Sequence, residues 1–199
     1  MEQHRYRFWP WFLDNWSRMA LPAAALMLCS LPVFLTANNA PLVLAYALLP
    51  IYMVHQYEEH AHGGFVRFVN ETMGEGREVL TKVSAFWINV LDVWLLFLVS
   101  YLLAKYVALG FALMPVYLTL INGITHIVAG VALRRYNPGL ITSLALFLPL
   151  GLFLLAYVGA VIRHDLLFNT VGVLAGVAGH AVIIAYALSR RNRLRHVPR

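Results

Sequence analysis

Residues 140–162 read LITSLALFLPLGLFLLAYVGAVI, an apolar stretch that contains no charged side chain. A helix needs about 20 apolar residues to cross the hydrocarbon core of a bilayer. A transmembrane β-strand would instead alternate in polarity over about ten residues, and this stretch does not alternate. The stretch therefore predicts a membrane-spanning helix, and Asn137-Pro138-Gly139 directly before it marks a sharp turn.

Similar apolar runs lie elsewhere in the chain. Their lengths are again near 20 residues, so they predict helices by the same reasoning. They cover residues 19–37, 41–57, 84–103, 107–133 and 166–188. The expected fold is an all-α, polytopic transmembrane helix bundle of about six spans.

The composition supports this fold and excludes several other classes of protein. The chain has 199 residues, of which 61% are hydrophobic and 12% charged, and its mean hydropathy is +0.70. Soluble domains carry about a quarter charged residues, and a disulfide scaffold needs more than the single cysteine, Cys29. We divide the chain into an interfacial N-terminal segment (1–18), a single transmembrane helical domain (19–189) and a basic cytoplasmic tail (190–199).

The lysines and arginines predict which ends of the spans face the cytoplasm. With six spans and a cytoplasmic N-terminus, only Lys105 and Arg163 of the 15 basic residues fall on the opposite side. Cytoplasmic loops carry an excess of Lys and Arg, so both termini are predicted to be cytoplasmic. The tail is expected to contact anionic lipid rather than nucleic acid. The sequence leaves open the oligomeric state and whether the first span is retained or cleaved as a signal peptide.

A small set of ionisable and amide side chains interrupts the predicted spans. Such groups are costly inside a membrane and by default mark a functional site. Four spans bring such groups to roughly the same predicted level, about 10–13 Å inside the cytoplasmic boundary at 1.5 Å per residue, with the two glutamates closer to the surface. The set comprises His55, Glu58 and Glu59 at the end of the second span, Asn89 and Asp92 in the third, Asn122 and His126 in the fourth, and His180 in the sixth.

The residue types in this set indicate a metal site. His55, Glu58, Glu59 and His62 are spaced i, i+3, i+4 and i+7, which places them on one stripe if the helix continues through them. Imidazoles and carboxylates bind first-row metals, and a cation would offset the repulsion between adjacent glutamates. We expect a divalent ion, zinc or iron. The predicted ligands are His55, Glu59, His126 and His180, with His62 as a further ligand.

The remaining members of the set have predicted supporting roles. Glu58 is the candidate catalytic residue, a general base acting on metal-bound water. Asn89, Asp92 and Asn122 are expected to orient the ligand imidazoles from outside.

Simpler interpretations stand beside these roles. A single buried histidine is more often hydrogen-bonded to a neighbouring helix than bound to a metal, which applies to His126 and to His180. His62 lies in a charged stretch near a loop, where solvation explains it equally well. Asp92 could pair with Lys82, and the asparagines could serve as interhelical hydrogen-bonding residues.

Two sequence blocks resemble a known family. The first is His55-x-x-Glu58-Glu59 followed by Gly63-Gly64, and the second is Asn122-Gly-Ile-Thr-His126 leading to Arg135-Tyr136-Asn137-Pro138-Gly139. With these blocks the chain resembles the HXXEE domain-containing integral membrane protein family, from about Pro41 to the end of the sixth span. The resemblance implies a multi-span protein of the bacterial inner membrane with a metal-type site, and it implies no particular activity.

Three functions fit the sequence. The preferred one is a membrane metal-dependent hydrolase or oxygenase that acts on a lipid-like substrate near the cytoplasmic leaflet. A transporter or proton-coupled channel would use the same histidines and glutamates as a relay, but the outer halves of the spans are mostly apolar. A non-catalytic or haem-binding membrane subunit would use His126 and His180 as axial ligands.

Overall fold

The computed structural model describes residues 2–195, with side chains from residue 8 onward. In this part of the chain the regular secondary structure is entirely helical. Residue 1, the side chains of residues 2–7 and the last four residues of the predicted tail lie outside the description. Six segments are long and apolar enough to cross a membrane: Phe8–Phe34, Ala40–Thr72, Lys82–Tyr106, Leu109–Leu133, Leu140–Val161 and Leu166–Arg195. The predicted all-α, six-span fold is therefore confirmed.

Short irregular turns subdivide several spans. The α-helices are α1 (Glu2–Phe34), α2 (Ala40–Tyr46), α3 (Leu48–His60), α4 (Gly64–Thr72), α5 (Lys82–Ile88), α6 (Leu95–Tyr106), α7 (Leu113–Leu133), α8 (Leu140–Thr142), α9 (Leu148–Val161) and α10 (Leu166–Arg195). Between them lie the 3₁₀ turns η1 (Ala61–Gly63) and η3 (Leu109–Ala112) and the π-helical turns η2 (Asn89–Trp94) and η4 (Ser143–Phe147).

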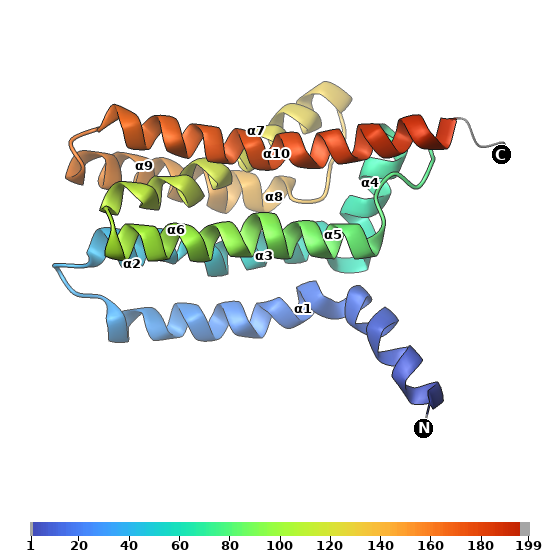
Figure 1. The fold of residues 1–199 in the computed structure, drawn as a ribbon, viewed down its shortest axis with the longest axis horizontal. Helices are drawn as coiled ribbons and strands as arrows, with labels where there is room; N and C mark the ends of the chain where they lie inside the picture. The colour runs from blue at the N-terminus through green and yellow to red at the C-terminus, as the bar shows by residue number, and fades with distance from the viewer. Residues whose placement is uncertain (1, 196–199) are drawn as a thin grey trace.

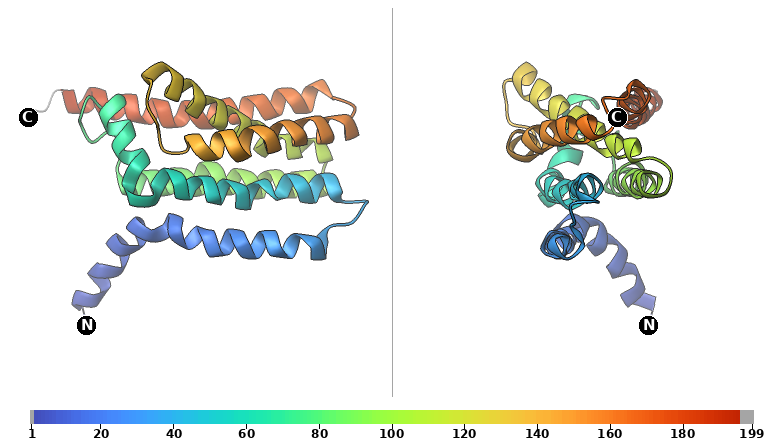
Figure 2. Two further views of the ribbon diagram at one scale, coloured as in Figure 1. Left: turned by 180° about the vertical axis from the view of Figure 1, so that it is seen from behind. Right: turned by 90° about the vertical axis from the view of Figure 1, so that its left-hand side faces the viewer.

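The long helices run back and forth along the length of the molecule, so both described chain ends lie at the same end of the bundle (Figure 1). α10 packs along α7, α7 packs against α9, and α1 packs against α3. The end-on view in Figure 2 shows α1 at one edge of the bundle. This arrangement agrees with the predicted topology; which end is cytoplasmic stays a prediction from the Lys and Arg pattern.

Two breaks shape the polar end of the bundle. α1 changes direction part-way along its length (Figure 1), and Pro22 within it lacks the N–H that would bond to the carbonyl of Arg18. α3 continues three residues past its predicted end and stops at His60, because His62 (φ 62°) and Gly63 (φ 68°) adopt left-handed backbone conformations. α4 then leaves at a steep angle to α3 (Figure 1).

The apolar core lies directly beside the polar residues. Tyr52, Phe97 and Phe147 are almost fully buried and pack with leucines and valines from α3, α7 and α9. π-helical turns in longer helices occur frequently at functional sites. Here η2 carries Asn89 and Asp92, and η4 carries Phe147, whose ring centroid lies 4.2 Å from that of His55.

Candidate metal centre

Three of the predicted ligands meet inside the bundle. His55 and Glu59 lie one helical turn apart on α3, His126 projects from α7, and all three are buried. Their nearest ligand atoms lie within 4.8 Å of one another. Glu59 Oε1 lies 3.1 Å from His126 Nε2 and 3.5 Å from His55 Nε2. We refer to His55, Glu59 and His126 as the triad.

A hydroxyl group fixes Nδ1 of His55, the outer ring nitrogen that faces away from the triad. Its Nδ1 lies 2.7 Å from Thr142 Oγ1, and that hydroxyl donates to Glu58 Oε2 at 2.5 Å. A hydroxyl has one hydrogen, so Thr142 must accept from His55, and Nδ1 of His55 carries the proton. In the neutral ring Nε2 is then a free acceptor, and it points to the triad.

The outer nitrogen of His126 is held by a buried turn residue. Asn137 Nδ2 donates to the carbonyl of His126 at 2.9 Å, which identifies its Oδ1 as the acceptor for His126 Nδ1 at 2.6 Å. Nε2 of the neutral His126 ring is therefore also an acceptor. Asn137 is 1% exposed, unusually low for a turn asparagine, because its amide serves this histidine.

Gly139 lets the turn approach both imidazoles. Its φ is +102°, a conformation that side chains other than glycine's rarely adopt. A Cβ at this position would lie 2.6 Å from His126 Cε1 and 2.8 Å from His55 Cε1. The backbone of the turn between α7 and α8 thus covers the triad directly, and no larger residue fits there.

The triad therefore brings three acceptors together. When both rings are neutral, two imidazole lone pairs face one carboxylate oxygen, whereas a proton on His126 Nε2 would make its 3.1 Å contact with Glu59 a hydrogen bond. His55 Nε2 is buried without a hydrogen-bond partner among the described residues. Buried polar atoms are normally satisfied, so this arrangement calls for a cation or an added proton at its centre. Two histidines and one glutamate are also a common ligand set of catalytic zinc and of non-haem iron. The cluster could bind a metal ion.

Glu58 lies next to Glu59 in sequence but binds a different part of the protein. Its carboxylate accepts hydrogen bonds from the backbone N–H groups of Ile141 (3.0 Å) and Thr142 (2.7 Å), and from the hydroxyls of Tyr136 (2.9 Å) and Thr142. It thereby satisfies free N–H groups at the start of α8. Partial burial and the hydrogen bond to Glu58 raise the pKa of Tyr136 to about 12, so its hydroxyl remains a donor at neutral pH.

The other two predicted ligands lie outside the triad. His62 follows the end of α3, is exposed, and accepts from the guanidinium of Arg18. His180 lies on α10, donates from Nδ1 to the carbonyl of Gly176 at 2.8 Å, and has a buried Nε2 without a hydrogen-bond partner in the described chain.

The three residues predicted to orient the ligands surround the triad without bonding its imidazoles in the described structure. Asn89 donates to His60, and the carboxylate of Asp92 packs against Gly179. The buried Oδ1 of Asn122 has no hydrogen-bond partner within the described residues. Thr142 and Asn137 instead make the hydrogen bonds that orient the imidazoles. Sequence reasoning missed both residues. The signal was present in the second family block, which includes Asn137, but the sequence was interpreted there only as a turn.

Two cavities reach the triad. A cavity of about 330 Å³ between α4, α7 and α10 is lined by Glu59 and His126 and otherwise mainly by apolar side chains, among them Phe65, Leu133 and Ile184. A smaller cavity of about 40 Å³ has polar groups from four helices in its wall: Glu59, Asn89, Asp92, Asn122 and His180. Polar side chains from four of the predicted spans therefore line this second cavity.

A comparison with known protein families agrees with the resemblance found in the two sequence blocks. The family described as "Protein of unknown function with HXXEE motif" matches residues 46–154, which is more than half of the chain. The chain belongs to the HXXEE family. No curated protein and no solved structure matches it. In this chain the HXXEE motif supplies two members of the triad, His55 and Glu59, together with Glu58, which binds the turn that covers them.

Proposed function

We propose that this protein is a membrane-embedded, metal-dependent enzyme whose ion is held by His55, Glu59 and His126. The observation that carries the proposal is the pair of Nε2 lone pairs, each fixed by an outer hydrogen bond and aimed at one carboxylate oxygen. Such outer bonds orient metal-binding imidazoles and raise their basicity. The same geometry supports both zinc and iron.

The bound ion would act as a Lewis acid and would lower the pKa of a water molecule that it holds. Hydrolysis is the reaction class that this arrangement supports best, and an oxygenase is the alternative if the ion is iron.

The residues around the cavity have separable roles in this proposal. Glu58 uses both carboxylate oxygens to hold the turn, and can accept a proton only if those bonds break, so we assign it a positioning role. His180 is better placed as proton acceptor, because its buried Nε2 is free and it shares both cavities with Glu59. The apolar wall of the larger cavity fits a hydrocarbon chain, which makes a lipid-like molecule the proposed substrate.

Elemental analysis of protein purified in detergent without chelators tests the proposal. We expect about one zinc or iron ion per chain in the wild type, and its loss in His55→Ala. His62→Ala is the matched control, because it removes a histidine of the same segment that lies outside the triad, and it should keep the metal. A wild-type protein that holds no stoichiometric metal, even after incubation with Zn²⁺ and with Fe²⁺, would overturn the proposal.

A further inference from the structure

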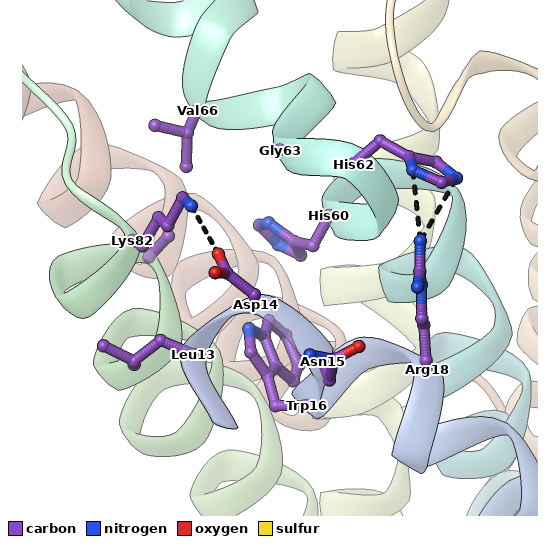
Figure 3. A pocket seen from close by; sticks show the side chains of 11 residues that line it. Leu13, Asp14, Asn15, Trp16, Arg18, His60, His62, Gly63, Val66 and Lys82 are labelled. Atoms are coloured by element: carbon purple, nitrogen blue, oxygen red, sulfur yellow. Dashed lines mark hydrogen bonds and ion pairs between the residues drawn. The ribbon is translucent and has the colours of Figure 1, made fainter. Parts of the chain in front are cut away.

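A polar cavity of about 340 Å³ shares no lining residue with the apolar cavity. It opens between the first half of α1, the break between α3 and α4, and the start of α5 (Figure 3). Its back wall includes the buried Trp16 and His60, and its rim carries Asp14, Arg18, His62 and Lys82. The triad makes no use of this cavity.

The rim carries cationic side chains with unused hydrogen-bond donors. Lys82 pairs with Asp14. Among the described residues, the hydrogen-bonding contacts of Arg18 are with the ring of His62, at 3.1 Å from Nδ1 and 3.4 Å from Nε2 (Figure 3). A neutral imidazole has one acceptor nitrogen, so at most one of these contacts is a hydrogen bond. A guanidinium has five N–H donors in a planar fork, and most of those of Arg18 are therefore available to an anion.

A third donor comes from His60 in the back wall of the cavity. The indole N–H of Trp94 can only donate, so Gln56 accepts with Oε1 and donates with Nε2 to Asn89 Oδ1. Asn89 Nδ2 then donates to the carbonyl of Ala85 and to His60 Nε2. The hydrogen of the neutral His60 ring is consequently on Nδ1.

That hydrogen has no acceptor in the described part of the protein. His60 is 8% exposed and lines the cavity, and among the described residues its Nδ1 makes no hydrogen bond. Because His60 lines the cavity, this unpartnered N–H can donate to an acceptor bound there. Arg18, Lys82 and His60 together present donors from three helical segments to one volume.

The position of the cavity identifies the source of that acceptor. It lies at the end of the bundle that carries both chain termini, where Lys82 begins the third span. Trp9 and Trp11 are exposed on the adjacent part of α1, and exposed tryptophans concentrate at the level of lipid headgroups. The positive-inside pattern assigns this end to the cytoplasmic leaflet, which is rich in anionic lipid.

We propose that this cavity binds the phosphate group of an anionic phospholipid. The phosphate oxygens accept from Arg18, Lys82 and His60. The carboxylate of Asp14 disfavours a second negative charge on the ligand and can accept from a hydroxyl group of the headgroup. A phosphodiester with a polyol headgroup, such as phosphatidylglycerol, satisfies both conditions.

Native mass spectrometry of the detergent-purified full chain tests the site. Phosphatidylglycerol is the probe, phosphatidylcholine is the zwitterionic comparison, and glycerol 3-phosphate and inorganic phosphate are the soluble competitors. We expect Arg18→Gln and Lys82→Gln each to weaken phosphatidylglycerol binding by about tenfold or more, the range for a lost charge-assisted hydrogen bond. The matched control is Arg193→Gln, which removes the same charge at the same end of the bundle but outside the cavity.

The outcomes separate the two sources of phosphate. Arg18-dependent retention of phosphatidylglycerol that the soluble competitors do not displace supports a lipid site. Arg18-dependent binding of glycerol 3-phosphate or inorganic phosphate alone supports the phosphate chemistry but assigns the ligand to the soluble pool. If Arg18→Gln and Lys82→Gln both bind every probe as Arg193→Gln does, the proposal is overturned. None of these outcomes depends on the metal content of the triad.

Discussion

Glu58 and Glu59 are neighbours in the chain but lie in opposite environments. Four donors from the turn and the start of α8 surround Glu58, whereas acceptor nitrogens surround Glu59. A carboxylate surrounded by donors is already stabilised, while one that faces lone pairs needs a cation. The difference teaches that the two glutamates of the HXXEE motif have separate tasks, one holding the cover of the site and the other facing its centre.

Replacing each glutamate with glutamine is the strongest test of this difference. Glu59→Gln should lower metal affinity by roughly a thousandfold, because it removes one of three ligands. Glu58→Gln should lower it by only about 10- to 100-fold, as expected for a residue that acts through a ligand's outer bond. Competition with a chelator measures both affinities, and equal losses in the two variants would refute the division of tasks.

The same pair of variants should differ in stability without metal. The amide introduced by Glu59→Gln can donate to an imidazole lone pair, so this variant should unfold no earlier than metal-free wild type. Glu58→Gln places an amide N–H₂ against donors and should cost about 1–3 kcal/mol. Thermal unfolding in excess chelator measures this, with the exposed Glu78→Gln as the control for losing a carboxylate.

Substituting Gly139 tests the contact between the covering turn and the triad. Gly139→Ala should destabilise the fold by about 3 kcal/mol and displace both imidazoles, because its φ is positive and its Cβ would overlap them. Gly76→Ala is the matched control: Gly76 also has a positive φ (+81°), but its Cβ would meet nothing within 4 Å. Chemical denaturation of the two variants separates backbone strain from the clash, and equal losses would show that the clash contributes nothing.

A smaller effect is expected from Thr142, which links His55 to Glu58. Thr142→Val keeps the shape but removes the hydroxyl, and should weaken metal binding by about tenfold. Thr142→Ser retains the hydroxyl and should stay near wild type. A valine variant with unchanged affinity would show that the tautomer of His55 does not depend on this link.

The smallest effect should come from Tyr136. Tyr136→Phe removes one of four donors to Glu58, and because this side chain is 53% exposed we expect a loss of about 1 kcal/mol in stability and little change in metal affinity. Thermal unfolding measures the first and chelator competition the second. A loss of metal as large as in Glu58→Gln would mean that Tyr136 alone holds the glutamate in place.

Much of this architecture could be predicted from the sequence. The spans follow from long apolar runs, and His55 and Glu59 share a helix face at i, i+4, so a common site on α3 was predictable. His126 could be placed at the same depth by counting residues from the span end. His62 could not be placed, since a helix was assumed to continue where the chain adopts positive φ values.

The residues that fix the imidazoles were harder to predict. Asn137 has the sequence context of an ordinary turn residue beside proline and glycine, and Thr142 has that of a helix start. Their roles depend on a turn folding back over α3, which is a tertiary contact that local patterns do not encode. The same holds for the polar cavity, which exists because α1 bends and brings Arg18 beside His62.

The turn between α7 and α8 has a consequence for biosynthesis. His55, Glu59 and His126 all leave the ribosome before Asn137, Gly139 and Thr142, which orient and cover them. During membrane insertion these three residues are therefore present before Thr142 and Asn137, so their imidazoles can still adopt either tautomer. The tautomers are fixed only when the fifth span has been inserted and the turn before it has closed. Under the proposed function, metal binding would therefore come late in the assembly of this protein.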